Sequence, residues 1–417
     1  MEDSQSERPE IYAILCADWG KAARKRAVYA ANVRQRLVYR LSPGTGWSVG
    51  AILAEAERLS RDGPVLAAFD APLGLPESYL AVAAKVLSPG LRVGFLDFLR
   101  QVYLIPGFFE PTTIATDWRI EQPFFSVPAG EGGLTSYRNA AAEKGVDLFR
   151  RIDKATKAKT LFATSGIPGS VGCAACSLWR EIGTLLRNSP TFRVWPFEGD
   201  LGTLLRSGSI TIGETYPRAA YATALIDGSV ESRPPLSLAK TNADVRGSAI
   251  EALINSEWVR AQGVRIEGLE NAKENEDDFD ACIAAAALLR CELERLPFSA
   301  PWRETDRTEG GILGTGSINL ALKERPWRDS SRDRRAAKHL AERPARIVVS
   351  SDAGKVLRCP IEGCSKCYVN VRSGWDAHVG SLRTHPFWRP HLVSSEERKA
   401  QFVAEFPEFF AGGIKPL

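Results

Sequence analysis

The sequence lacks a long hydrophobic run. Its longest apolar stretch, residues 281–289, is far too short to cross a bilayer. The first ten residues, MEDSQSERPE, are polar and acidic, and they contain no apolar segment of the kind found in secretory signal peptides. We therefore expect a soluble, cytoplasmic protein with no membrane partner.

The sequence also has little net charge, no internal repeats and no Walker-type phosphate loop. The net charge of +4 does not by itself identify a nucleic-acid-binding protein, so any basic surface must be local. In a reducing compartment, the eight cysteines favour thiols or metal ligands over disulfides. With 44% hydrophobic residues in 417, the chain can bury a large core and is long enough for more than one domain.

The first seventy residues predict three strands, a helix and a fourth strand. This is the opening order of ribonuclease H-like folds, in which the first and fourth strands lie side by side in parallel. By analogy with that fold, Asp18 and Asp70, which follow these two strands, would emerge at the same edge of the sheet. The predicted strands are 11–17, 26–32, 37–41 and 65–69, and the predicted helix is 47–59.

Further acids stand where apolar segments begin or end. Glu214 follows a short apolar strand at 209–213, and Asp277 and Asp280 open an apolar helix, three residues apart on one face. An acid at the carboxyl end of a buried strand lies where α/β sheets place their ligands. A purely structural role is the alternative for each of these acids, because acids also cap turns and interact favourably with the N-terminal end of a helix dipole.

Clustered carboxylates are the ligands that a pair of hard divalent cations requires for phosphoryl transfer. Asp18, Asp70, Glu214, Asp277 and Asp280 are therefore the candidate catalytic residues, with Mg²⁺ or Mn²⁺ as the cofactor. The leading hypothesis is a nuclease that cleaves phosphodiester bonds in DNA or RNA.

Two alternatives remain open. The segment Asp18-x-Gly20-Lys21 could be the phosphate loop of an ATP-dependent phosphotransferase related to actin, heat-shock chaperones and sugar kinases, with a weak Gly-rich segment at 311–316. The chain could also be a non-catalytic nucleic-acid-binding protein. Lys21 is a candidate substrate-binding residue under both the nuclease and the phosphotransferase hypothesis.

A set of motifs carries a family resemblance over most of the first three hundred residues. In order, the sequence CADWGK, FDAPLGLP, VWPFEGDL, ETYPRAAYA and DDFDACIAAA resembles the domain-of-unknown-function family number four hundred and twenty-nine, whose members are predicted nucleases. The resemblance implies an α/β, ribonuclease H-like mixed sheet flanked by helices, with a large, mostly helical insertion. It implies metal ligands at Asp18, Asp70, Glu214 and Asp280, with Asp277 as their partner, and phosphate-binding residues at Lys240 and Arg246.

A cluster of cysteines and histidines near the C-terminus resembles a C2H2 zinc finger. The first half, Cys359-x4-Cys364, has a usual spacing, but the gaps before His378 and between His378 and His385 are longer than usual. Cys367 could replace one ligand, so the choice of four among these five stays open. A structural Zn²⁺ is expected here, and the preceding basic residues favour nucleic acid as the partner.

Two weaker patterns lie in the insertion. Cys173 and Cys176 have CxxC spacing, which is compatible with redox or metal chemistry but also with inert helical thiols. The run 149–159 and the nearby aromatic loop could line a strand-binding groove or form a solvated helix face. The predicted domains are the nuclease domain 1–314 with its insertion at about 98–200, a basic linker 315–355, the zinc finger 356–392 and a tail 393–417.

Overall fold

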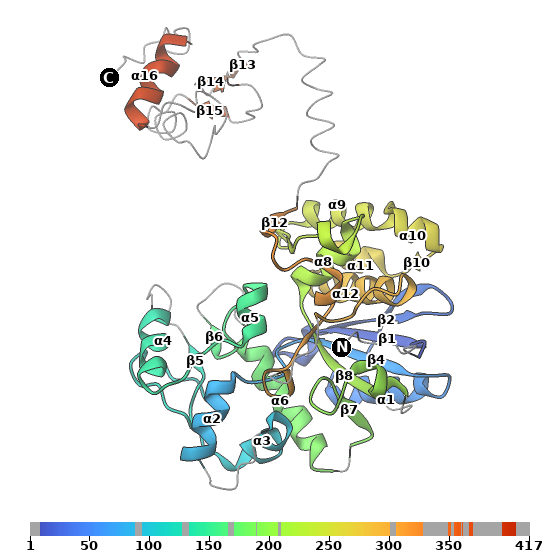
Figure 1. The fold of residues 1–417 in the computed structure, drawn as a ribbon. Helices are drawn as coiled ribbons and strands as arrows, with labels where there is room; N and C mark the ends of the chain where they lie inside the picture. Colours follow the sequence, from blue (N-terminus) through green and yellow to red (C-terminus); the bar gives the residue numbers. More distant parts are fainter. Residues whose placement is uncertain are drawn as a thin grey trace. The chain divides into compact units, whose positions relative to one another are not determined.

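The computed structural model divides into two units, residues 1–329 and 330–417, which are described separately below (Figure 1). In the first unit it describes residues 9–87, 94–126, 133–165, 171–188, 190–206, 210–300 and 306–327. In the second unit it describes residues 349–351, 354–359, 361, 367–369 and 394–405.

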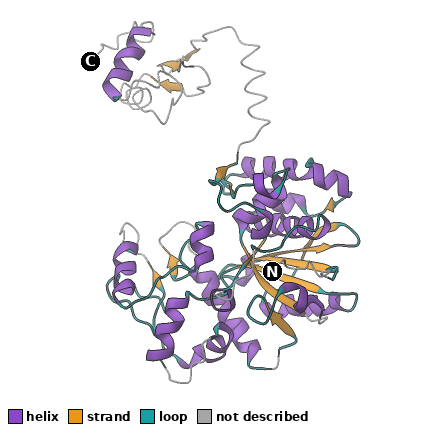
Figure 2. Ribbon diagram, viewed as in Figure 1, coloured by secondary structure: helices purple, strands orange, loops and turns teal. Residues whose placement is uncertain are grey.

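A mixed sheet of eight strands forms the centre of the first unit (Figure 2). The strand order is β10-β3-β2-β1-β4-β8-β11, and β7 also pairs with β8. β1, β2 and β3 form the predicted antiparallel meander, while β4 and β8 run parallel to β1. The strands are β1 (Ala13–Asp18), β2 (Ala27–Asn32), β3 (Leu37–Leu41), β4 (Val65–Asp70), β7 (Phe192–Val194), β8 (Ile210–Thr215), β10 (Arg265–Ile266) and β11 (Ile312–Leu313).

The register between β1 and β4 brings two acids together. The strands pair from Ala13 opposite Val65 to Asp18 opposite Asp70, which confirms the predicted adjacency. Alternate residues of both strands enter hydrophobic cores on opposite faces of the sheet. A strand that is buried on both faces needs a continuous apolar run, and this explains the two sequences AILCA and VLAAF.

Helices cover both faces of the sheet. α8 (Pro217–Leu225), α11 (Leu269–Glu274) and α12 (Glu276–Leu293) lie on one face, and α1 (Val49–Ser60) lies on the other (Figure 1). α12 packs against β1, β2 and α8, and it is buried on all sides from Asp278 to Glu292. Its run of alanines allows this, because a helix that is apolar all round can be enclosed by its neighbours.

The segment between β4 and β8 is mostly helical and shares the core on the α1 face of the sheet. It begins with α2 already at residue 77 and returns to the sheet at β7, so the expected insertion at 98–200 differs from the observed segment at both ends. Its elements are α2 (Glu77–Val86), α3 (Phe95–Gln101), η2 (Val102–Leu104), β5 (Phe125–Ser126), α4 (Leu134–Glu143), α5 (Arg151–Thr156), β6 (Ala163–Ser165), α6 (Gly172–Leu186) and α7 (Leu201–Arg206), the last lying between β7 and β8.

The first unit continues past residue 314, where the basic linker was expected to begin. The Arg233 guanidinium donates to the carbonyl of Ser317 at 2.8 Å, and the Ser317 side chain is fully buried. β12 (Arg325–Pro326) pairs with β9 (Leu236–Ser237). Residues 315–327 are therefore part of the folded body. The prediction grouped this segment with the charged run that follows it, although Ile318 is buried and Leu320 and Trp327 pack against the core.

The described part of the second unit contains the antiparallel strands β13 (Val349–Ser351), β14 (Gly354–Arg358) and β15 (Cys367–Val369), and the helix α16 (Ser395–Glu405). Cys359 is buried. The predicted zinc ligands Cys364, His378 and His385 lie outside the described residues, as does the side chain of Cys367. The zinc prediction therefore stays a prediction. Within the described residues, no helix is both long and apolar enough to cross a membrane.

Candidate metal centre

Three aspartates converge at one edge of the sheet, and we call Asp18, Asp70 and Asp280 the aspartate triad. One carboxylate oxygen from each lies within 4.8 Å of the others. Asp18 ends β1, Asp70 ends β4, and Asp280 lies near the start of α12. Asp18 and Asp70 are half-buried, and Asp280 is only 2% exposed. Asp18 and Asp280, which are 262 positions apart in the sequence, thus lie close together, as predicted.

The beginning of α12 determines where Asp280 lies. Asn275 is the N-cap, and its side-chain oxygen accepts hydrogen bonds from the backbone N–H groups of Asp277 and Asp278. An Asn at this position satisfies donors that the helix leaves unpaired, so the helix begins at a defined residue. Asp280 follows about one turn later and faces β1.

The loop after Asp70 is held by a close approach of two backbone segments. At Gly74, which has a φ of +134°, a Cβ atom would lie 2.0 Å from the carbonyl oxygen of Glu309. At Gly310, which has a φ of +83°, a Cβ atom would lie 1.9 Å from the carbonyl oxygen of Leu73. Only glycine fits both positions, because any side chain would collide with the opposite backbone.

Asp280 has two polar partners within the protein. The hydroxyl of Tyr221, on α8, donates to one of its oxygens, and the ammonium of Lys240 pairs with the other. Lys240 thus lies at the site, and its predicted role in phosphate binding stays a prediction. Tyr221 was not identified from the sequence, although it lies in the ETYPRAAYA motif, because a tyrosine on an apolar helix is typical of a core.

Arg246 plays a different part from the phosphate-binding role expected of it. It is 5% exposed, and its guanidinium donates to the backbone carbonyls of Lys240, Lys273 and Glu274. Arg246 therefore holds the backbone of Lys240 and the segment that leads into α12. In this structure its donors are engaged by the protein's own backbone.

The electrostatics of the triad oppose full ionisation. Burial raises the pKa of Asp70 to about 7, and the nearby charge of Asp280 adds to the effect. Burial, followed by the charges of Asp280 and Asp70, also raises the pKa of Asp18 well above its usual value. Burial raises the pKa of Asp280 as well, although Lys240 opposes the shift. The pKa of Lys240 is lowered by burial but raised on balance by Asp280 and Asp18.

The donor set fits a hard divalent cation. Three carboxylates and one ammonium leave two negative charges, −3 + 1, which one dication would neutralise. An all-oxygen set suits Mg²⁺ or Mn²⁺ better than the sulfur and nitrogen ligands typical of zinc sites. Asp277 is half-buried and its charge raises the pKa values of Asp18 and Asp280, so it lies close enough to add negative charge for a second cation.

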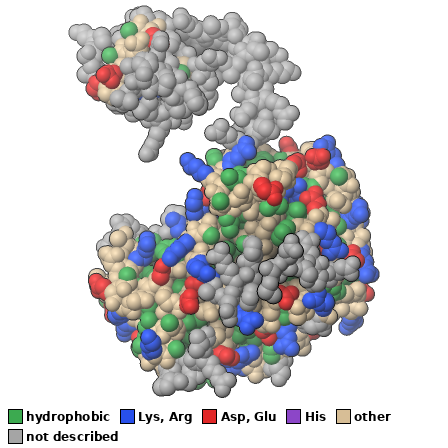
Figure 3. Space-filling view, viewed as in Figure 1, with side chains coloured by type: hydrophobic (Ala, Val, Ile, Leu, Met, Phe, Trp, Pro, Cys, Tyr) green, Lys and Arg blue, Asp and Glu red, His purple; other side chains and the backbone are tan. Residues whose placement is uncertain are grey.

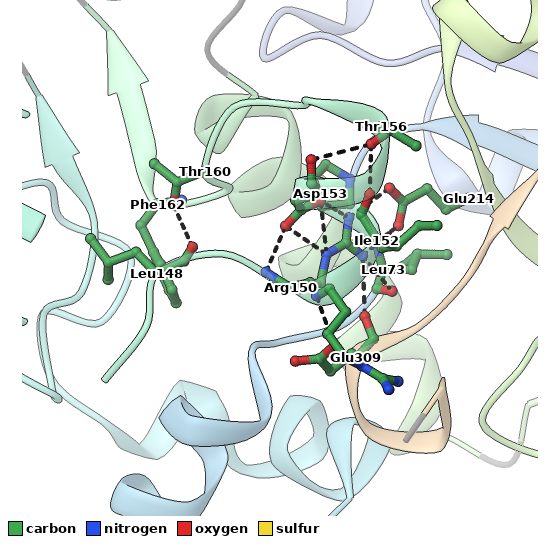
Figure 4. Close-up of polar contacts among 12 residues, drawn as sticks. Leu73, Leu148, Arg150, Ile152, Asp153, Thr156, Thr160, Phe162, Glu214 and Glu309 are labelled. Carbon is green, nitrogen blue, oxygen red and sulfur yellow. Dashed lines mark hydrogen bonds and ion pairs between the residues drawn. The ribbon is translucent and has the colours of Figure 1, made fainter. Parts of the chain in front are cut away.

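The structure does not bring Glu214 into the triad. Glu214 is in β8 beside the end of β4, and its charge contributes to the raised pKa of Asp70. Both of its oxygens accept from the guanidinium of Arg150, at 2.7 and 2.8 Å, and one also accepts from the backbone N–H of Leu73 (Figure 4). To act as a metal ligand, Glu214 would have to release at least one of these bonds.

We call Arg150, Asp153 and Glu214 the Arg150 cluster. Arg150 is 1% exposed and also donates to the carboxylate of Asp153 and to the carbonyls of Leu73 and Glu309 (Figure 4). Burial lowers the pKa of Arg150, but the charges of Asp153 and Glu214 raise it on balance. The run 149–159, considered above as a strand-binding surface, thus contributes its first arginine to the interior. The charge pattern of the sequence does not reveal the contact between Arg150 and Glu214.

The remaining candidates in the first unit form no ion pair with the triad among the described residues. Lys21 is exposed after β1, and its charge acts to lower the pKa of the Cys176 thiol on α6. Burial raises the pKa of the Cys176 thiol to about 12, while the Cys173 thiol donates to the carbonyl of Thr164. A thiol protonated at neutral pH is a poor nucleophile or ligand, so the CxxC pair fits inert packing.

The glycines at 311–316 are explained by packing and, at Gly314, by a positive φ of +87°. A Cβ atom at Gly311 would lie 2.7 Å from the ring of Trp195, and one at Gly316 would lie 2.2 Å from the carbonyl oxygen of Ser299. Tight packing accounts for these residues without a bound phosphate.

Comparison of the chain with protein families, with curated proteins and with solved structures finds no match in any of the three. The family resemblance described above therefore rests on the sequence motifs alone.

Proposed function

We propose that the protein is a divalent-metal-dependent nuclease that hydrolyses phosphodiester bonds of DNA or RNA at the aspartate triad. The observation that carries this proposal is the convergence of three carboxylates from β1, β4 and α12 within 4.8 Å. The order β3-β2-β1-β4, with β8 parallel beyond it, supports a ribonuclease H-like fold for the sheet. Rigid elements fix the spacing of the carboxylates, as two-metal phosphoryl transfer requires.

Each residue of the site has a role in this proposal. Asp18, Asp70 and Asp280 would hold Mg²⁺ or Mn²⁺, which supplies activation of the attacking water and stabilisation of the leaving oxygen. Tyr221 donates to Asp280 and so fixes the orientation of its carboxylate. Lys240 places a positive charge beside the triad and reduces the repulsion that an approaching phosphodiester would meet.

The experiment is a cleavage panel with the full chain, using single- and double-stranded DNA and RNA with Mg²⁺, Mn²⁺ or a chelator. We expect metal-dependent cleavage that Asp70→Asn and Asp280→Asn each reduce about a thousandfold, because loss of a ligand removes several kcal/mol of charge stabilisation. Asp278→Asn is the matched control. Asp278 is a buried acid on the same helix, but it pairs with Arg40 at 2.5 Å.

Three outcomes would overturn the proposal. Cleavage by Asp70→Asn at the wild-type rate would remove the triad from catalysis. ATP binding without nucleic-acid cleavage would favour the phosphotransferase alternative. Tight nucleic-acid binding that Asp18→Asn and Asp70→Asn leave unchanged, with no cleavage under any metal, would favour a non-catalytic binding protein.

We propose further that the C-terminal unit binds structural Zn²⁺ and assists nucleic-acid binding. This rests on the spacing of Cys359, Cys364, Cys367, His378 and His385 in the sequence. Cys364→Ser should lose zinc in elemental analysis. A chain that ends at Arg346 should show a raised KM with little change in kcat, and an unchanged KM would contradict the assisting role.

A further inference from the structure

A groove with aromatic and cationic walls lies on the insertion, and the function proposed above does not use it. It encloses about 300 Å³ between η2 with the loop that follows it and the helix α6. Its walls include Tyr103, Phe109, Glu110, Arg180 and Arg187.

Two arginine–aromatic pairs form the outer part of this groove. The guanidinium of Arg187 lies 4.2 Å from the ring centre of Tyr103, and that of Arg180 lies 4.7 Å from the ring centre of Phe109. Arg180 and Arg187 are seven residues apart, so they lie two turns apart on one face of the helix. Tyr103 is 57% exposed, and both arginines are exposed.

Neither arginine is neutralised by a carboxylate among the ion pairs of the described residues. Arg187 donates to the hydroxyl of Thr184 at 3.2 Å, while Glu110 lines the opposite wall of the groove. Two positive charges against one negative charge leave a net positive wall. On the face of the first unit in Figure 3, by contrast, blue Lys and Arg side chains and red Asp and Glu side chains are interspersed.

We propose that this groove binds an unpaired base of a single-stranded nucleic acid, with the arginines contacting the adjoining phosphates. An exposed aromatic ring such as that of Tyr103 binds bases of any sequence by stacking, and a cationic wall is complementary to the backbone. A volume of about 300 Å³ is at the small end for ligand sites, which fits one flat base rather than a helix of a protein partner. The assignment of the strand as substrate rests on the nuclease function proposed above.

Two cations lie near Cys176 on α6, and one of them, Arg180, belongs to the wall of the groove. The charges of Arg180 and Lys21 both lower the pKa of the Cys176 thiol, so both cations lie near this thiol on α6. Lys21 follows Asp18 by three residues. α6 in turn packs against α3 and against α1, which covers the sheet. The groove therefore lies on a helix that packs against α1, and Lys21, which follows β1, lies near that helix.

The test uses the full chain with a 5-iodouracil-containing oligodeoxyuridylate, its oligouridylate counterpart and the corresponding duplexes. Photo-crosslinking followed by peptide mapping should place the single strands on the peptide that contains Tyr103 or Phe109. Tyr103→Ala and Arg187→Ala should each weaken binding about tenfold, whereas Tyr103→Phe, which keeps the stacking ring, should bind normally. Arg206→Ala, at an exposed arginine on α7, is the matched control and should change nothing.

The two proposals fail in different ways. If the wild-type protein cleaves and Tyr103→Ala leaves both KM and crosslinking unchanged, the groove proposal is overturned and the nuclease stands. If single strands crosslink at the groove but no metal supports cleavage, the groove stands and the nuclease falls. Crosslinks confined to residues 330–417, or equal affinity for single strands and duplexes, would also overturn the groove proposal.

Discussion

Two groups of acids, one buried and one partly buried, lie near each other in the first unit, and they balance their charges differently. In the Arg150 cluster, one guanidinium bonds both carboxylates, and backbone groups occupy the remaining positions. In the aspartate triad, a single ammonium faces three carboxylates, and the pKa values of all three are raised.

This difference separates a structural group from a candidate binding site. Glu214 and Arg150 lost their hydrating water on burial and bond each other instead. A metal ion would therefore have to displace Arg150 from Glu214. The triad keeps two uncompensated charges that either protons or a dication must offset. Burial of acids alone would not distinguish the two groups, whereas the partners of each oxygen do.

The largest effect should come from removing the cation of the compensated group. Arg150→Met leaves the Glu214 and Asp153 carboxylates buried without their partner and should lower the free energy of unfolding by about 3–5 kcal/mol. Mn²⁺ should not restore this loss. Urea unfolding with and without Mn²⁺ measures both quantities. Arg151→Met is the control, because Arg151 is more exposed, and it should cost less than about 1 kcal/mol. Equal losses for the two variants would contradict the distinction.

The triad should show the opposite behaviour when a charge is removed. The folded pKa of Asp70, about 7, lies above its unfolded value of 3.8, so ionisation disfavours the folded state. The stability of the metal-free protein should therefore fall as the pH rises from about 4 to about 7, and it should stay low above that range. Asp70→Asn removes this cost and should be more stable than wild type at pH 8 by about 1–3 kcal/mol.

Urea midpoints at pH 5 and pH 8 test this prediction, and Asp278→Asn should be less stable than wild type at both. Mn²⁺ should raise the wild-type midpoint but not that of Asp70→Asn. A metal-free Asp70→Asn protein that is less stable than wild type at pH 8 would show that the triad carries no electrostatic strain.

The smallest effect should be that of Glu214→Gln on metal affinity. Since Arg150 already holds both oxygens of Glu214, the Kd for Mn²⁺ should change by less than about threefold, under 1 kcal/mol. Asp70→Asn should weaken the same affinity by more than about tenfold. Titration calorimetry compares the two directly. Equal losses would restore Glu214 as the metal ligand that the sequence predicted, and Arg150 would then have to release it when metal binds.

The sequence predicted the part of the fold whose pattern is local. Continuous apolar runs identified β1 and β4, and the breakers after Asp70 identified the edge where the acids lie. The strands β7, β10 and β11 have only two or three residues, too few for any periodicity, and they were missed. Their pairing depends on neighbours that are already in place.

The sequence predicted the acids of the site but not their contacts with Arg150 and Tyr221. Asp18, Asp70 and Asp280 follow recognisable apolar segments, whereas the partners that decide their chemistry do not. Arg150 is 64 residues from Glu214, and Tyr221 is 59 residues from Asp280. Only the three-dimensional structure shows that Glu214 is bonded by Arg150, whereas Asp70 lies with two other carboxylates at a spacing that suits a metal ion.

The contact between Gly74 and Gly310 has a consequence for how much of the chain is needed. The loop after Asp70 rests against a backbone that is made more than two hundred residues later, with no room for even a methyl group between them. A fragment cut before residue 309 would keep most of the strands but would lose the wall that supports this loop. A minimal version of the first unit should therefore begin from residues 9–327, and shorter truncations should be judged first by whether they still bind Mn²⁺.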